Sequence, residues 1–293
     1  MLANRLLFIF ILSLFGLSLN ARLLSQEKIE GHFASVNEEI KNRWNGFQAD
    51  REFKLFEMDR SDDQLSQEFE ELKKIRKWIW TTPGYELGEH LIRDDFVRAP
   101  HCLSFAFNNT VPNYNASTMY QGGKNYIACE GPRSKDISNF FKLLVSHRVT
   151  HLVRLTDSFE GETKKCHPYW EGHSSDGWLR VPTETGVYPI RSFDMAYWKD
   201  NEGVDPKQLL AVVLKVREEL KEGLLLVHCS AGVGRTGTFL ASIAIVDAID
   251  QGEPFSIEEI VYRLSLQRPH SVAKLGQYIT LYRLAELYLK ERS

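Results

Sequence analysis

The chain has 293 residues, of which 43% are hydrophobic and 12% aromatic, a composition that can bury one sizeable core. The formal net charge of −3 gives no basic excess for binding nucleic acid, and the four cysteines lack the close pairing of a disulfide framework. The histidines are scattered without ligand spacing, so we expect no metal, and nothing in the sequence implies another cofactor.

The N-terminal residues 1–21 have the pattern of an export signal. Arg5 precedes a nearly continuous apolar run over residues 6–19. The run is short for a transmembrane helix, which needs roughly 20 residues, so we expect cleavage more than retention as a membrane anchor. Both outcomes stay open, because Leu19 fits poorly at the third place before a cut after Ala21. We therefore expect an exported protein, secreted or periplasmic, that meets a membrane only if the segment is retained.

Residues 22–60 are polar with scattered aromatics and indicate a leader or an accessory helical segment. We assign residues 61–293 to one α/β domain, in which residues 150–155 and 223–228 are apolar runs suited to buried central strands. Apolar side chains at helical spacing predict the surrounding helices. Their expected core positions are Leu65, Phe69 and Leu72; Ile137, Phe140, Phe141 and Leu144; Leu209, Val212, Val213 and Val216; and Tyr278, Leu281, Tyr282 and Ala285.

Two helix starts have cap signals. Asp205 followed by Pro206 predicts a cap and a first helical turn. Ser256 and Glu259 form a capping-box pattern for a later helix. Between these starts, residues 236–249 are apolar on nearly every side, which predicts a helix buried against the sheet.

The segment from Val227 to Gly237 places a cysteine and an arginine on either side of five small residues, between the apolar strand and the buried helix. The five are Ser230, Ala231, Gly232, Val233 and Gly234. Small side chains let backbone N–H groups of the loop and of the helix N-terminus converge on an anion. Arg235 can hold two phosphate oxygens in a fork, and the positive helix end favours the thiolate of Cys229. The segment predicts a phosphate-holding thiolate, whereas we expect Cys102, Cys129 and Cys166 to be inert packing residues.

This segment resembles the signature loop of the cysteine-dependent protein tyrosine phosphatases, which is His-Cys, five residues, Arg, and Ser or Thr. The resemblance implies that Cys229 is the nucleophile of a phosphocysteine intermediate and that Arg235, with the five small residues, binds the phosphate. It implies that the Thr236 hydroxyl steadies the leaving thiolate and that His228 tunes the cysteine. For residues 61–293 it implies a central mixed twisted sheet flanked by helices.

The same chemistry needs an acid to protonate the leaving oxygen. The family's acid loop is Trp-Pro-Asp followed by a Gly-Val pair, and this chain has Trp198, Lys199 and Asp200 before such a pair. The resemblance therefore implies that Asp200 is the general acid, with Asp194 as the reserve candidate. Lysine replaces a proline that would restrict the loop backbone, so closure of this loop is expected to be looser or differently timed.

A third match lies near the C-terminus, where Gln267, Arg268 and Pro269 are followed by Gln277. The resemblance implies that Gln277 positions the water that hydrolyses the intermediate. Ala273 stands where the family usually has another glutamine. Further matches are expected to define the fold alone; they lie at residues 115–117, 126–132, 165–166 and 169–170.

The family's tyrosine-bearing loop, which stacks on the substrate phenol, has no match between Arg98 and Asn115. Hydrolysis of phosphotyrosine in proteins is the leading hypothesis. An inositol-phosphate (phytase-like) cysteine phosphatase and a dual-specificity phosphatase stay as alternatives, because a shallower pocket would accept other phosphate esters. A binding module for phosphorylated ligands is a third hypothesis. The expected partners are phosphorylated proteins or small phosphate esters.

Overall fold

The computed structural model describes residues 26–47, 52–81 and 114–292. The expected export signal and nearly all of the stretch between Arg98 and Asn115 lie outside these ranges. Within them, no helix combines the length and the apolar character needed to cross a membrane.

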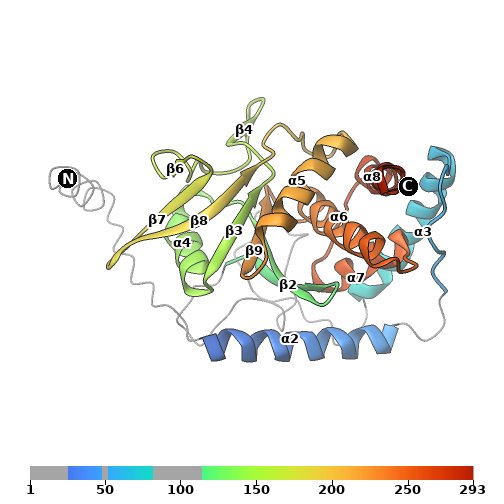
Figure 1. Cartoon of the computed structure of the whole chain (residues 1–293), viewed down its shortest axis with the longest axis horizontal. Helices are drawn as coiled ribbons and strands as arrows, with labels where there is room; N and C mark the ends of the chain where they lie inside the picture. The colour runs from blue at the N-terminus through green and yellow to red at the C-terminus, as the bar shows by residue number, and fades with distance from the viewer. Residues whose placement is uncertain (1–25, 48–51, 82–113, 293) are drawn as a thin grey trace.

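A seven-stranded mixed sheet forms the centre of the molecule, as the resemblance implies (Figure 1). Its strands lie in the order β1-β2-β9-β3-β8-β7-β6. The central strands β2, β9, β3 and β8 run parallel, whereas β1, β7 and β6 are antiparallel to their neighbours. The strands span Ala116–Gln121 (β1), Lys124–Glu130 (β2), Val149–Arg154 (β3), Ser174–Ser175 (β6), Trp178–Thr183 (β7), Gly186–Asp194 (β8) and Leu224–Cys229 (β9). A separate hairpin pairs β4 (Phe159–Glu160) with β5 (Thr163–Lys164).

Helices cover both faces of the sheet (Figure 1). They span Gln26–Phe47 (α2), Asp62–Thr81 (α3), Ile137–Ser146 (α4), Pro206–Glu219 (α5), Gly234–Gln251 (α6), Ile257–Gln267 (α7) and Leu275–Arg292 (α8), with a short 3₁₀ turn at Ser134–Asp136 (η2). Side chains of α3, α5, α6, α7 and α8 form one hydrophobic core with one face of the sheet. Side chains of α2 and α4 form the second core with the other face.

The predicted strands and helix starts are confirmed within one or two residues. The two apolar runs are β3 and β9, and the buried helix behind the signature loop is α6. The Asp205 side chain accepts a hydrogen bond from the Lys207 N–H at 3.0 Å, and the Ser256 hydroxyl accepts one from the Glu259 N–H at 3.2 Å. All the expected core positions are buried except Val212, which is partly buried against the same core.

Helix α2 packs on the edge strand β1. Ile29 and Phe33 lie in the second core with Tyr114. His32 adds a polar contact, with its Nε2 3.0 Å from the Thr118 hydroxyl oxygen. Of the two expectations for residues 22–60, a leader or an accessory helical segment, the second agrees with α2, which contributes side chains to the core around the sheet.

Strand β9 places the signature loop. All six of its residues are buried, and it lies between β2 and β3 at the centre of the sheet. Its last residue is Cys229, and α6 begins five residues later at Gly234. The cysteine therefore lies at the carboxyl edge of the parallel strands, where open α/β sheets bind their ligands.

Candidate active site

The signature loop folds around the Cys229 sulfur. The Gly232 N–H donates to Sγ at 3.2 Å, and Cys229 is 3% exposed. Gly232 has φ +71°, and a Cβ at this position would overlap with the carbonyl oxygen of Cys129 at the end of β2. Only glycine combines this backbone conformation with so close an approach. The packing of the loop against β2 thus explains why the sequence has a glycine at position 232.

Arg268 holds the outer side of the loop. Its guanidinium is fully buried and donates to the carbonyl oxygens of Gly232 at 2.5 Å and Ala231 at 3.1 Å, and to Asn115 Oδ1 at 3.1 Å. Burial lowers the pKa of Arg268, although the acidic groups around it act in the opposite direction. Because Arg268 binds the loop carbonyl oxygens on the outer side, the peptide groups are oriented with their N–H groups toward the sulfur.

Arg235 lies at the bottom of the site with unused hydrogen-bonding capacity. Its Nη1 donates to Glu160 Oε1 at 2.6 Å and to the Trp198 carbonyl oxygen at 2.5 Å. Among the described residues, its Nε and Nη2 and the Thr236 hydroxyl are buried without a hydrogen-bond partner. Buried polar groups in native proteins are nearly always satisfied, so these groups can still bind an oxyanion. This geometry fits the predicted role of Arg235, and it leaves the Thr236 hydroxyl available for a hydrogen bond.

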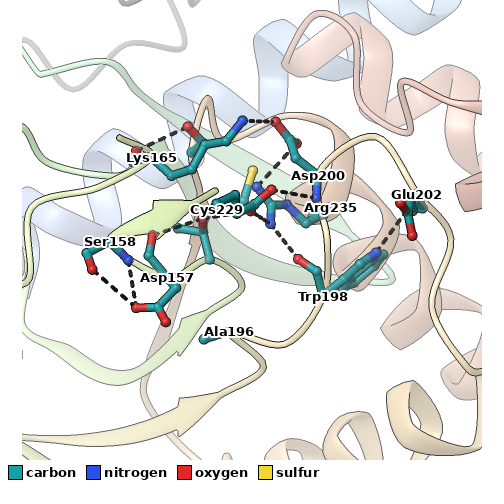
Figure 2. A network of polar contacts seen from close by, with 12 residues as sticks. Asp157, Ser158, Lys165, Ala196, Trp198, Asp200, Glu202, Cys229 and Arg235 are labelled. Atoms are coloured by element: carbon teal, nitrogen blue, oxygen red, sulfur yellow. Dashed lines mark hydrogen bonds and ion pairs between the residues drawn. The ribbon is translucent and has the colours of Figure 1, made fainter. Parts of the chain in front are cut away.

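The acid loop is docked over Arg235 (Figure 2). Trp198 is buried, and its Nε1 donates to the Glu202 carbonyl oxygen at 2.9 Å. Asp200 Oδ1 lies 3.2 Å from Arg235 Nη2, and Asp200 Oδ2 accepts from Lys165 Nζ at 2.7 Å. The structure therefore brings Asp200 to the same guanidinium that faces the loop of Cys229, although the two segments lie about thirty residues apart.

Asp200 is held as a carboxylate in this arrangement. Burial raises the pKa of Asp200, but the hydrogen bond from Lys165 and the charges of Arg235 and Lys165 outweigh it, so the net shift is downward. A general acid must carry a proton when the substrate is bound. A phosphate dianion next to Asp200 shifts its pKa upward by charge repulsion, and it also competes for Arg235.

The substitution Lys165→Met is expected to move the alkaline limb of the pH profile of kcat/KM to higher pH. Lys165 lowers the pKa of Asp200, so its loss raises that pKa and keeps the acid protonated further up the pH scale. Rates with p-nitrophenyl phosphate across pH 4–9 measure the shift. Lys164→Met, at the exposed neighbour, is the control and should leave the limb in place. A limb that stays in place or moves down in K165M would contradict this coupling.

The reserve candidate Asp194 is engaged elsewhere. It ends β8, and its carboxylate pairs with Arg154 and accepts from the Ala196 N–H at 2.8 Å. No contact with Arg235 or with the loop of Cys229 is found for it within the described residues. Asp194 thus supports the start of the acid loop, and Asp200 stays the predicted acid.

His228 is a neutral support for the loop. Its Nδ1 lies 3.1 Å from the Cys229 carbonyl oxygen and its Nε2 lies 2.7 Å from the Tyr169 hydroxyl. A carbonyl oxygen only accepts, so Nδ1 carries the proton and Nε2 accepts from Tyr169. Burial lowers the pKa of His228 to about 3, which keeps the ring neutral. It therefore acts on the cysteine through the backbone carbonyl.

Gln277 lies against the start of α6. Its Oε1 accepts from the Ala273 N–H at 2.9 Å and the Lys274 N–H at 3.3 Å. A Cβ added to Gly234 would lie 2.9 Å from Gln277 Nε2. The side chain thus reaches the phosphate loop, which fits the predicted role in positioning water.

Sequence reasoning missed three side chains of the site. Glu160 links the signature loop to the acid loop, because its Oε1 accepts from Arg235 and its Oε2 accepts from the Asp200 N–H at 2.9 Å. Lys165 stood in a match that we had expected to define the fold only, and Arg268 stood in the C-terminal match, where we assigned a role to Gln277 alone. A signal was available for Glu160 and Lys165, since Glu160 lies in a charged hairpin and Lys165, the lysine of the matched Lys-Cys pair, follows that hairpin directly.

The family model described as protein-tyrosine phosphatase matches residues 107–184 and 178–286, which is more than half of the chain. The chain belongs to the protein-tyrosine phosphatase family. Receptor-type tyrosine-protein phosphatase V of Rattus norvegicus is 30% identical over 258 residues, covering 74% of this chain and 15% of that protein. Receptor-type tyrosine-protein phosphatase epsilon of the same species is 32% identical over 206 residues, covering 60% of this chain and 30% of that protein. The chain thus spans less than a third of the full length of each of these two relatives.

The fold of this family member is also found in solved structures. The catalytic domain of human protein tyrosine phosphatase non-receptor type 18 superposes with a TM-score of 0.69 at 21% identity. The superposition covers 78% of this chain and 96% of that domain. The match confirms the mixed sheet flanked by helices.

Proposed function

We propose that the chain hydrolyses phosphotyrosine in proteins through a phosphocysteine intermediate. One observation supports this most directly. The Cys229 sulfur, the Arg235 guanidinium, whose Nε has no hydrogen-bond partner among the described residues, and the Asp200 carboxylate converge on one site. A nucleophile, an anion clamp and a proton donor are the parts that transfer of a phosphoryl group requires.

In the first step the Cys229 thiolate attacks phosphorus and the bond from phosphorus to the ester oxygen breaks. Protonated Asp200 gives its proton to the leaving oxygen. Arg235 and the loop N–H groups stabilise the charge on the three phosphoryl oxygens in the transition state.

In the second step a water molecule attacks the phosphocysteine. Its proton passes to the Asp200 carboxylate, the sulfur–phosphorus bond breaks and Cys229 leaves as a thiolate. The Thr236 hydroxyl stabilises this leaving group by a hydrogen bond, and Gln277 orients the water. Phosphate is released, and both residues return to their starting protonation states.

We propose phosphotyrosine rather than another phosphate ester as the substrate because the chain belongs to the protein-tyrosine phosphatase family. Protein tyrosine phosphatase non-receptor type 18 (PTPN18), whose fold this chain shares, has been solved in complex with phosphopeptides of HER2. The sequence between Arg98 and Asn115 has no match to the family's phenol-stacking loop and lies almost wholly outside the described residues, so a comparison of substrates tests the selectivity.

The test is a set of initial rates measured on the full chain with a reducing agent present. The substrates are a phosphotyrosine peptide, a phosphoserine peptide and inositol hexakisphosphate. The proposal expects the highest kcat/KM for the phosphotyrosine peptide. A higher value for the inositol phosphate would replace it with the phytase-like alternative, and binding without turnover of any substrate would indicate a binding module.

Export by the N-terminal segment is part of the proposal. It is supported by the arginine and the apolar run within residues 1–21. N-terminal sequencing of the protein recovered outside the cytoplasm would place the cut, and an intact Met1 in a membrane fraction would indicate a retained anchor.

A further inference from the structure

The segment between α7 and α8 has an unusual backbone. His270 has φ +59° and Val272 has φ +56°, both in the left-handed region. Non-glycine residues seldom adopt this region, and it is least favourable for a β-branched residue such as valine. Val272 is also completely buried. A conformation of this kind persists only where surrounding contacts fix it.

Arg76 supplies contacts of this kind from outside the segment. This residue lies on α3, before the residues that the family model matches. Its Nη1 donates to the carbonyl oxygens of Ser271 at 2.7 Å and Val272 at 3.1 Å. The guanidinium lies 5.2 Å from the centre of the Phe69 ring, and Arg76 is 6% exposed. Charge-assisted hydrogen bonds in a buried setting are strong, so Arg76 fixes the two carbonyl groups in place.

The held segment reaches the catalytic machinery on both of its sides. A Cβ added to Gly237, in the first turn of α6, would lie 2.7 Å from Ser271 Cβ. The N–H groups of Ala273 and Lys274, which follow Val272 directly, donate to Gln277 Oε1. A shift of the segment therefore moves the amide that lies against the phosphate loop.

We propose that Arg76 is a positioning residue for hydrolysis of the phosphocysteine, acting through residues 271–274 on Gln277. The proposal rests on the proposed function. The step concerned is attack of water on phosphorus, with the proton passing to Asp200 and the sulfur–phosphorus bond breaking. Formation of the intermediate uses Cys229, Arg235 and Asp200, so it does not depend on Arg76.

Pre-steady-state kinetics with p-nitrophenyl phosphate separate the two steps. The burst of p-nitrophenol reports formation of the intermediate, and the steady-state rate reports its hydrolysis. In Arg76→Met, which keeps an apolar side chain over Phe69, the burst rate constant is expected to stay within about twofold. The hydrolysis rate is expected to fall about tenfold to a hundredfold, the cost of a small misplacement at a reacting group. Labelled phosphate should accumulate on Cys229.

Lys73→Met is the matched control. Lys73 lies one turn earlier on α3, 5.9 Å from the centre of the same Phe69 ring, and pairs with Glu70 at the surface. Its loss should leave both rates unchanged. In Gln277→Ala the same selective loss is expected, and R76M combined with Q277A should be no slower than Q277A alone.

Equal loss in both phases, or unchanged hydrolysis in a folded R76M variant, would overturn the positioning role. Should R76M fail to fold, Arg76→Lys keeps the charge and carries the same comparison. Failure of the proposed function is distinct, because the unmodified chain would then show no burst and no phosphate on Cys229.

Discussion

Replacing Cys229 with serine is expected to abolish turnover while leaving phosphate binding largely intact. The anion is held by Arg235 and by backbone N–H groups, none of which the substitution removes. A hydroxyl is far less ionised than a thiol at neutral pH, so it cannot replace the nucleophile. Turnover is measured with p-nitrophenyl phosphate, and binding is measured by calorimetry with inorganic phosphate.

Cys129→Ala is the control for this change. Cys129 is also a buried, unpaired cysteine, but its side chain belongs to the second core on the other face of the sheet. Its loss should leave most of the activity. Substantial turnover by C229S, or phosphate found by mass spectrometry on another side chain, would end the phosphocysteine mechanism.

Replacing Asp200 with alanine is expected to lower the rate by about 10² to 10⁴ for an aryl phosphate with a poor leaving group, such as phenyl phosphate. The loss should be much smaller for p-nitrophenyl phosphate, whose leaving oxygen needs little protonation. Comparison of kcat/KM for the two esters measures the difference, because kcat/KM reports the step in which the ester bond breaks. The contact of Asp200 with Arg235, at the base of the site, is the structural reason for the expected effect.

Asp194→Ala distinguishes the acid from a supporting carboxylate. Asp194 is bound to Arg154 and to a backbone N–H of the acid loop. Its loss should therefore act on both esters alike, through the stability of the loop. If D200A lowered both rates equally, the acid would have to be sought elsewhere.

The parts of the site that the sequence predicts are those contained in one continuous run. Cys229 and Arg235 lie six residues apart between a buried strand and a buried helix, so their neighbours reveal the loop. Glu160 lies 75 residues before Arg235, and Arg76 lies 195 residues before Ser271. Each is a single charged residue among other charged residues, and its role depends on a contact that only the folded chain creates.

The fold shows the same division. Strands β3 and β9 are buried along nearly their whole length and carry the apolar runs that predict them closely. Strands β7 and β8 include exposed residues, and each contains a proline. They are defined by their antiparallel pairing, and no apolar run in the sequence indicates them.

The neutral imidazole of His228 contributes to the way acidity acts on this molecule. In an unfolded chain the ring takes up a proton near pH 6.5, but in the native chain it does so only near 3. Between these values the unfolded chain binds the extra proton, so each step toward acid favours unfolding, while the imidazole itself stays uncharged. At mildly acidic pH this ring therefore lowers the free energy of unfolding, and it adds no positive charge next to Cys229.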